Sequence, residues 1–217
     1  MKNFGKELKA ILTTFAAVFV FTDVVATSEV FAQQGSSPFE VTLSGGVQGI
    51  LDNETALQDN FVNIPVAAGI TYHVNSIFAV EGEFGWLIPI ENSVNIGSGQ
   101  KQDLKSPDIL SYQANIRAAL PLNLTNLSPY ATAGLGGMTF LSTDKSDRYP
   151  QLDESETMFA INFGVGTSFS LTGPWSVRAD FREFVAFPQN DAVAFSNGGE
   201  ADPIWMPRGT LGVSYQF

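Results

Sequence analysis

The feature of this chain that most constrains its fold is a two-residue alternation of apolar and polar side chains, which recurs in seven of eight predicted strands, the exception being a glycine-rich strand at residues 130–141 whose sidedness is not legible. The last segment shows it most clearly, because Leu211, Val213, Tyr215 and Phe217 alternate with small or polar residues. A period of two predicts a β-strand with one apolar face. The predicted strands cover residues 39–50, 61–73, 77–90, 108–122, 130–141, 158–171 and 175–187, followed by a closing strand after residue 205.

The connections between these strands fall into two classes. Those after the second, fourth and sixth strands are short turns, at residues 74–76, 123–127 and 172–174. The other four are long, as at residues 51–59 and 188–205. Short turns that alternate with long loops are typical of a membrane barrel, in which the short turns are periplasmic. We therefore expect an all-β fold, an eight-stranded antiparallel up-and-down transmembrane β-barrel.

Aromatic side chains gather at both ends of the predicted strands. Aromatic rings prefer the headgroup level of a membrane, so a barrel should carry one girdle at each interface. The predicted girdle at the short-turn end contains Tyr72, Phe78, Tyr130, Trp175, Tyr215 and Phe217. The predicted girdle at the long-loop end contains Phe61, Trp86, Tyr112, Phe140, Phe159 and Phe187.

The start of the chain has the pattern of a cleavable secretory signal peptide. Three lysines precede an apolar run at residues 10–21, and small residues follow. This run is shorter than the roughly 20 apolar residues that a membrane-spanning helix needs. We expect residues 1–32 to be the signal peptide, cleaved after Ala32, with Ala26 as the alternative site. Residues 33–217 then form a single barrel domain.

Three local motifs add a resemblance to a known family. They are the terminal Phe217 with Tyr215 two residues earlier, Tyr130-x-x-x-Gly134-x-Gly136-Gly137, and Trp175-x-x-Arg178-x-Asp180-x-Arg182. Together with the strand pattern they resemble the small outer-membrane β-barrel superfamily, which includes outer-membrane protein A-like barrels and "porin family" proteins. The resemblance implies a Gram-negative outer-membrane protein, exported through the periplasm. It also implies that Tyr215 and Phe217 form the signal read by the barrel-insertion machinery.

Charged residues on the predicted strands should face the barrel interior, because the apolar face must contact lipid. The charged residues predicted to face the lumen are Glu81, Glu83, Arg117, Arg178, Asp180, Arg182 and Arg208. The interior of an eight-stranded barrel is only wide enough to be filled by side chains. Unpaired buried charges are costly, so we expect a structural network of ion pairs. The alternative is that these residues line a path for ions.

Composition argues against several functional classes. The formal net charge of −11 argues against nucleic-acid binding, which depends on basic patches. The absence of cysteine excludes a disulfide scaffold and thiolate metal sites. The single histidine, His73, ends a strand at the short-turn side, away from the outer leaflet where a lipid-processing enzyme would need its base. We therefore predict no enzymatic activity, no cofactor and no metal site.

The function that this pattern favours is a structural or interaction scaffold that displays acidic loops outside the cell. The third long loop, for example, contains Asp144, Asp147, Asp153, Glu154 and Glu156. The expected partners of this monomer are outer-membrane lipid, lipopolysaccharide and an extracellular ligand of the loops. One alternative is a narrow pore for ions or small solutes. A second is a secreted soluble barrel with its faces reversed, which would bind an apolar ligand inside.

Overall fold

The computed structural model describes residues 37–50, 61–90, 92–95, 101–122, 124–142, 152–188 and 203–217. The predicted signal peptide, with both of its cleavage sites, lies outside these ranges. None of the described residues forms a helix that is long and apolar enough to cross a membrane.

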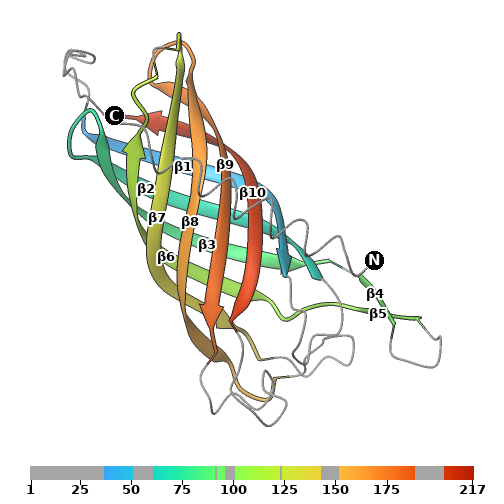
Figure 1. The fold of residues 1–217 in the computed structure, drawn as a ribbon. Helices are drawn as coiled ribbons and strands as arrows, with labels where there is room; N and C mark the ends of the chain where they lie inside the picture. The colour runs from blue at the N-terminus through green and yellow to red at the C-terminus, as the bar shows by residue number, and fades with distance from the viewer. Residues whose placement is uncertain are drawn as a thin grey trace. The chain divides into compact units, whose positions relative to one another are not determined.

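Eight strands close into one antiparallel barrel (Figure 1). They are β1 (Phe39–Ile50), β2 (Phe61–His73), β3 (Phe78–Pro89), β6 (Ile109–Ala119), β7 (Leu127–Phe140), β8 (Glu156–Ser170), β9 (Trp175–Phe187) and β10 (Ile204–Gln216). Each of these strands pairs with the barrel strand before it and the one after it, and β1 pairs with β10 to close the ring. The predicted eight-stranded up-and-down barrel is therefore confirmed.

The strand boundaries differ from the prediction by up to three residues, and one additional element was not predicted. β7 begins at Leu127 instead of residue 130, because residues 127–129 still pair with the end of β8. The long connection after β3 also contains a hairpin, in which β4 (Asn92–Asn95) pairs with β5 (Lys101–Leu104). These strands have four residues each, which is too short for an alternating pattern to stand out in the sequence. The hairpin lies at the opposite end of the barrel from the C-terminus (Figure 1).

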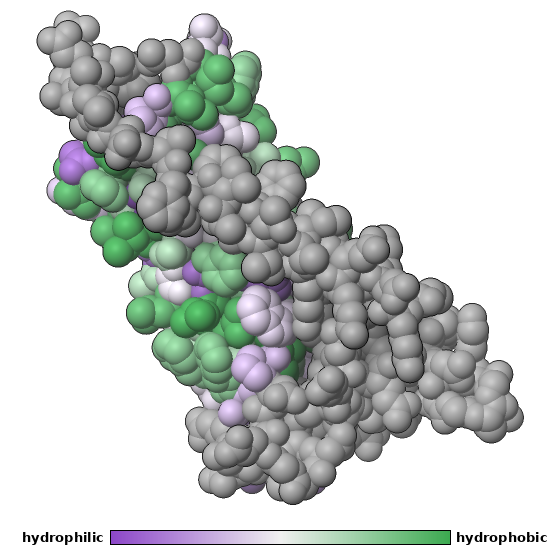
Figure 2. Space-filling view, in the orientation of Figure 1, coloured by the Kyte–Doolittle hydropathy of each residue, from purple (hydrophilic) through white to green (hydrophobic). Residues whose placement is uncertain are grey.

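The outer wall of the barrel is apolar. The alternation turns large side chains away from the interior, and Leu211, near the middle of β10, is 68% exposed. Figure 2 shows apolar residues, in green, over much of the described wall that is visible in this view. Soluble proteins rarely expose apolar surface on this scale. An apolar outer wall of this kind matches the lipid-facing surface of a membrane barrel.

Aromatic rings mark both ends of this wall, with two corrections to the prediction. At the short-turn end Tyr215 lies between Trp175 and Phe217, with ring centroids 4.9 and 5.1 Å away. Tyr130 and Phe140, which were predicted to belong to the girdles, are instead buried in the barrel interior. Both occupy the inward positions of β7, a glycine-rich strand whose sidedness is difficult to read from sequence. The side chain of Phe61 is not among those described.

Candidate functional site

The barrel interior contains two layers of side chains with different chemistry. The ionic layer consists of Glu40, Glu81, Glu83, Arg117, Arg178, Asp180, Arg182 and Arg208. The apolar layer lies at the long-loop end and consists of Ile50, Leu87, Ile109, Met138, Phe140, Leu152, Met158, Ala160, Phe184, Ala186, Ile204 and Met206. The geometry of these two layers determines what the interior can do.

Glu81 is the centre of the ionic layer. It is 1% exposed, and its Oε1 lies 2.9 Å from Nη2 of Arg182. Its Oε2 lies 3.0 Å from Nη1 of Arg178 and 3.6 Å from Nη1 of Arg117. The Asn115 amide also donates a hydrogen bond to Oε1 at 3.2 Å. One carboxylate thus neutralises parts of three guanidinium groups, in surroundings where charge interactions are much stronger than in water.

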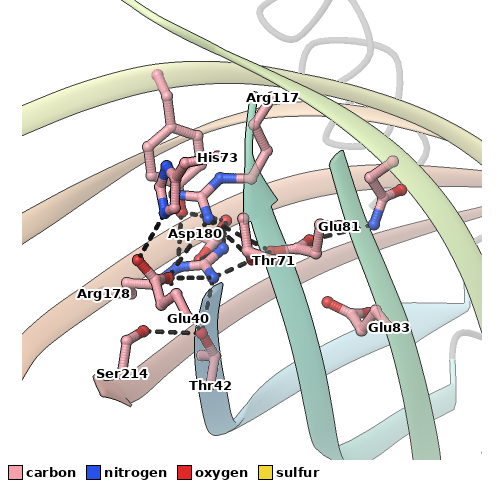
Figure 3. A network of polar contacts seen from close by, with 12 residues as sticks. Glu40, Thr42, Thr71, His73, Glu81, Glu83, Arg117, Arg178, Asp180 and Ser214 are labelled. Atoms are coloured by element: carbon pink, nitrogen blue, oxygen red, sulfur yellow. Dashed lines mark hydrogen bonds and ion pairs between the residues drawn. The ribbon is translucent and has the colours of Figure 1, made fainter. Parts of the chain in front are cut away.

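Glu40 links the ionic layer to the short-turn mouth of the barrel (Figure 3). Its Oε1 lies 3.5 Å from Nη1 of both Arg117 and Arg178. Its Oε2 lies 3.3 Å from Nε2 of His73, whose side chain is one-third exposed at this end. The only histidine of the chain therefore contacts a lumen carboxylate, and no nucleophile–base pair is formed by this contact.

The remaining two carboxylates pair with arginines of β9 and β10. Asp180 Oδ1 lies 3.1 Å from Nη2 of Arg182, and its Oδ2 lies 3.4 Å from Nη2 of Arg178. Glu83 Oε1 lies 2.6 Å from Nη2 of Arg208, and its Oε2 lies 3.5 Å from Nη1 of Arg182. Each of the four arginines in the layer thus has at least one carboxylate partner, and four carboxylates balance their charge.

Tyr130 packs into the centre of these ion pairs. Its ring lies under the guanidinium groups of Arg117 and Arg178, whose Cζ atoms are 4.1 and 5.4 Å from the ring centroid. Its hydroxyl donates to Asp180 at 2.7 Å and accepts from Nε of Arg178 at 3.1 Å. Gly166 makes room for the ring, since a Cβ at that position would lie 2.5 Å from its Cζ. This tyrosine therefore orients two arginines as well as filling space.

The apolar layer covers the ionic layer toward the long loops. It is built mainly from inward positions of the strands, such as Leu87 on β3 and Met206 on β10, and Leu152 joins it from the segment before β8. Its members are at most 3% exposed. Such packing leaves little space for water or ions. The layer was not predicted, although extending the inward row of Glu81 and Glu83 reaches Leu87.

The seven lumen residues predicted from the sequence all take part in these ion pairs. Glu40, His73 and Tyr130 were not predicted as part of the network. Glu40 stands on the polar face of the first strand, so the alternation alone was a sufficient signal for it. Tyr130 shares its face with Gly134 and Gly136, which present no side chain from which to judge the direction. Among the described residues, no group of three or more acidic, histidine or cysteine side chains is arranged to hold a metal ion.

We predict that Glu81→Ala destabilises the barrel by about 3–5 kcal/mol, because three buried guanidinium groups lose their common partner. The measurement is a urea titration of the barrel refolded in detergent. Glu154→Ala, which removes an exposed carboxylate before β8, is the matched control and should change the free energy of unfolding by less than about 0.5 kcal/mol. Equal effects of the two substitutions would contradict the central role of Glu81.

Comparisons with known proteins agree with this architecture. Residues 15–217 match the model of the outer membrane protein beta-barrel domain family. Neisserial surface protein A has a similar structure, with a TM-score of 0.58 and 14% identity, covering 85% of this chain and 100% of that chain. The N-terminal β-barrel domain of Pseudomonas aeruginosa OprF has a TM-score of 0.48 and 13% identity, covering 84% and 100%. Ail, the attachment invasion locus protein of Yersinia pestis, has a TM-score of 0.46 and 16% identity, covering 83% and 99%.

No curated protein sequence matches the chain significantly. At 14% identity, the similarity to the neisserial protein concerns the fold alone. The family model, in contrast, matches residues 15–217 of the 217-residue chain and includes every strand of the barrel. The chain therefore belongs to the outer membrane protein β-barrel domain family, and the protein is an integral barrel of the outer membrane.

Proposed function

We propose that this protein is a structural or interaction scaffold, a barrel with a filled lumen that holds its long loops outside the cell. The observation that carries the proposal is the filling of the interior by the ionic and apolar layers. A conducting path would have to pass both layers. Moving an ion through the apolar layer would remove its hydration without offering polar partners in return.

The ion pairs connect opposite walls of the barrel. Glu81 is on β3, and two of its partners, Arg178 and Arg182, are on β9. In the closed ring β3 and β9 are four strands apart, which is half of the circumference of an eight-stranded barrel. These contacts therefore act as struts across the lumen, and they support a rigid body better than a pore that must keep a passage open.

The long loops are the part of this scaffold that is suited to interaction. They contain most of the acidic residues, such as the exposed Asp153 and Glu154 before β8. The barrel closes on itself without a free strand edge, so a single chain provides a complete support. The proposed role requires no catalysis and no cofactor, and its partners are membrane lipid, lipopolysaccharide and an extracellular ligand of the loops.

The scaffold proposal predicts that purified protein in planar lipid bilayers shows little or no steady conductance. The matched comparison is Glu81→Ala, which removes a strut and should produce only brief, irregular openings of the barrel and no steady channel. Large and reproducible wild-type channels whose ion selectivity changes on substitution of Glu81 or Glu83 would contradict the scaffold and favour a narrow pore.

We further propose that Tyr215 and Phe217 form the signal for barrel insertion, as the family resemblance implied. Two features support this role. Both rings belong to the aromatic cluster with Trp175, in which Trp175 and Phe217 are exposed and Tyr215 is half-buried, so a protein partner can reach this cluster. The backbone of Phe217 also extends the pairing of β10 with β1, which closes the barrel. Its carbonyl accepts a hydrogen bond from the amide of Ser37, and its amide donates to the carbonyl of Phe39 at 3.1 Å.

Deletion of Tyr215 to Phe217 should therefore leave the chain in the periplasm, where it is degraded or aggregates. Phe217→Ala should reduce insertion in the same direction, whereas Phe187→Ala, which removes a ring at the opposite rim, should insert normally. Membrane fractionation and the mobility of unheated samples on gels measure both effects. Normal surface levels of the truncated protein would refute the signal.

A further inference from the structure

Four polar side chains near the junction of the two interior layers have hydrogen-bonding atoms without a partner among the described residues. They are Gln48 on β1, Asn63 on β2, Ser111 on β6 and Arg208 on β10. All four are at most 2% exposed. Native proteins satisfy nearly all buried polar groups, so a cluster of unpartnered ones points to a bound species.

These side chains come from neighbouring positions in the interior. Gln48 is in register with Asn63 on one side and with Arg208 on the other. The remaining member, Ser111, lies close to Arg208 beside Gly85 on β3. A Cβ built on Gly85 would lie 2.7 Å from Oγ of Ser111 and 3.9 Å from Nη1 of Arg208. The missing side chain of Gly85 thus leaves room for the Ser111 hydroxyl itself, close to the guanidinium group of Arg208. We refer to Gln48, Asn63, Ser111 and Arg208 as the donor cluster.

The unpartnered atoms of the donor cluster are mostly hydrogen-bond donors. Gln48 Nε2, Asn63 Nδ2 and the Nε and Nη1 atoms of Arg208 can only donate, and the Ser111 hydroxyl can donate or accept. The only unpartnered atom of the cluster that can only accept is Oε1 of Gln48. The Ser106 hydroxyl donates to Oδ1 of Asn63 at 2.8 Å, and Nδ2 of Asn63 is left without a partner among the described residues.

The local charge agrees with this excess of donors. Glu83 is shared between two guanidinium groups, at 2.6 Å from Arg208 and 3.5 Å from Arg182. Nε of Arg182 also lacks a hydrogen-bond partner among the described residues. Arg182 and Arg208 thus share the single carboxylate of Glu83 at this level of the barrel. The other carboxylate partners of Arg182, which are Glu81 and Asp180, are themselves shared with Arg178.

We propose that the donor cluster binds a small inorganic anion, of the size of chloride, bromide or nitrate, inside the barrel. An anion accepts hydrogen bonds from every side and brings no hydrogen that needs an acceptor. A water molecule accepts only about two hydrogen bonds, and its two hydrogens would occupy both Oε1 of Gln48 and the Ser111 hydroxyl. Water alone therefore satisfies the donors less well. The anion also places negative charge beside the shared arginine pair. The site extends the proposed scaffold, because an enclosed anion ties β1, β2, β6 and β10 together.

The test compares barrels refolded from urea in sodium chloride, sodium bromide or sodium gluconate at equal ionic strength. Refolding gives the anion access before the lumen closes, and gluconate is too large for the site. Chloride and bromide should raise the midpoint of thermal unfolding by about 3 °C or more over gluconate. Crystals of the bromide-refolded protein should show an anomalous peak within hydrogen-bonding distance of Arg208.

Two variants separate this site from general salt effects. Gln48→Met keeps the size of the side chain and removes its amide, so the difference between chloride and gluconate should shrink. Thr132→Val is the matched control, because it removes a buried hydroxyl without a partner at the level of Arg117, away from the donor cluster. It should keep the full chloride effect.

Equal midpoints in chloride and gluconate for the wild type, or crystals without bromide at Arg208, would overturn the proposal in favour of ordered water. If Gln48→Met fails to fold, the wild-type comparison and the anomalous peak still decide the question. A barrel that binds bromide but also conducts ions would contradict the scaffold and leave the anion site intact.

Discussion

The contact of the Glu81 carboxylate with three guanidinium groups is the interaction on which the interior of this barrel depends. Arg178 and Arg182 stand four residues apart on β9, on either side of Asp180, and Arg117 approaches from β6. Without an acidic partner these cations would repel one another in a region that is largely shielded from water. Glu81 on β3 lies on the wall opposite β9, so its attraction to Arg178 and Arg182 also acts across the full width of the barrel.

The remaining structure can be understood from two requirements that a membrane places on an eight-stranded barrel. The outer wall must be apolar, which sends inward the charged rows of β3 (Glu81 and Glu83) and β9 (Arg178, Asp180 and Arg182). The narrow interior must then be neutral as a whole, and four carboxylates against four arginines meet this condition. The apolar layer completes the filling toward the long loops. A rigid, filled barrel is a suitable support for loops that bind something outside the cell.

Most of the fold could be predicted because alternation in a strand has only two phases. Once the outer face is assigned to lipid, rows such as Glu81 and Glu83 must point inward. The prediction failed where this signal is weak. β7 carries glycine on both faces, so the inward direction of Tyr130 and Phe140 could not be read. The short β4–β5 hairpin has too few residues to show a period.

The ionic layer could be predicted as a set of residues but not as a set of pairs. Which carboxylate meets which arginine depends on the register of strands that are far apart in sequence, such as β3 and β9. The apolar layer was missed for a different reason. Methionine, leucine and isoleucine also occur at inward positions, such as Met206 two residues before Arg208 on β10. An assignment that places all apolar residues of a strand on the lipid-facing side puts these residues on the wrong face.

A double-mutant cycle between Glu81 and Arg182 tests the central claim most directly. The free energies of unfolding of the wild type, Glu81→Gln, Arg182→Gln and the double variant would be measured by urea titration in one detergent. If the two side chains form a strut across the lumen, the loss of unfolding free energy in the double variant should be smaller than the sum of the losses in the two single variants, by about 1–3 kcal/mol. Single effects that add to within about 0.5 kcal/mol would show that the two side chains do not depend on each other, and would contradict this account of the interior.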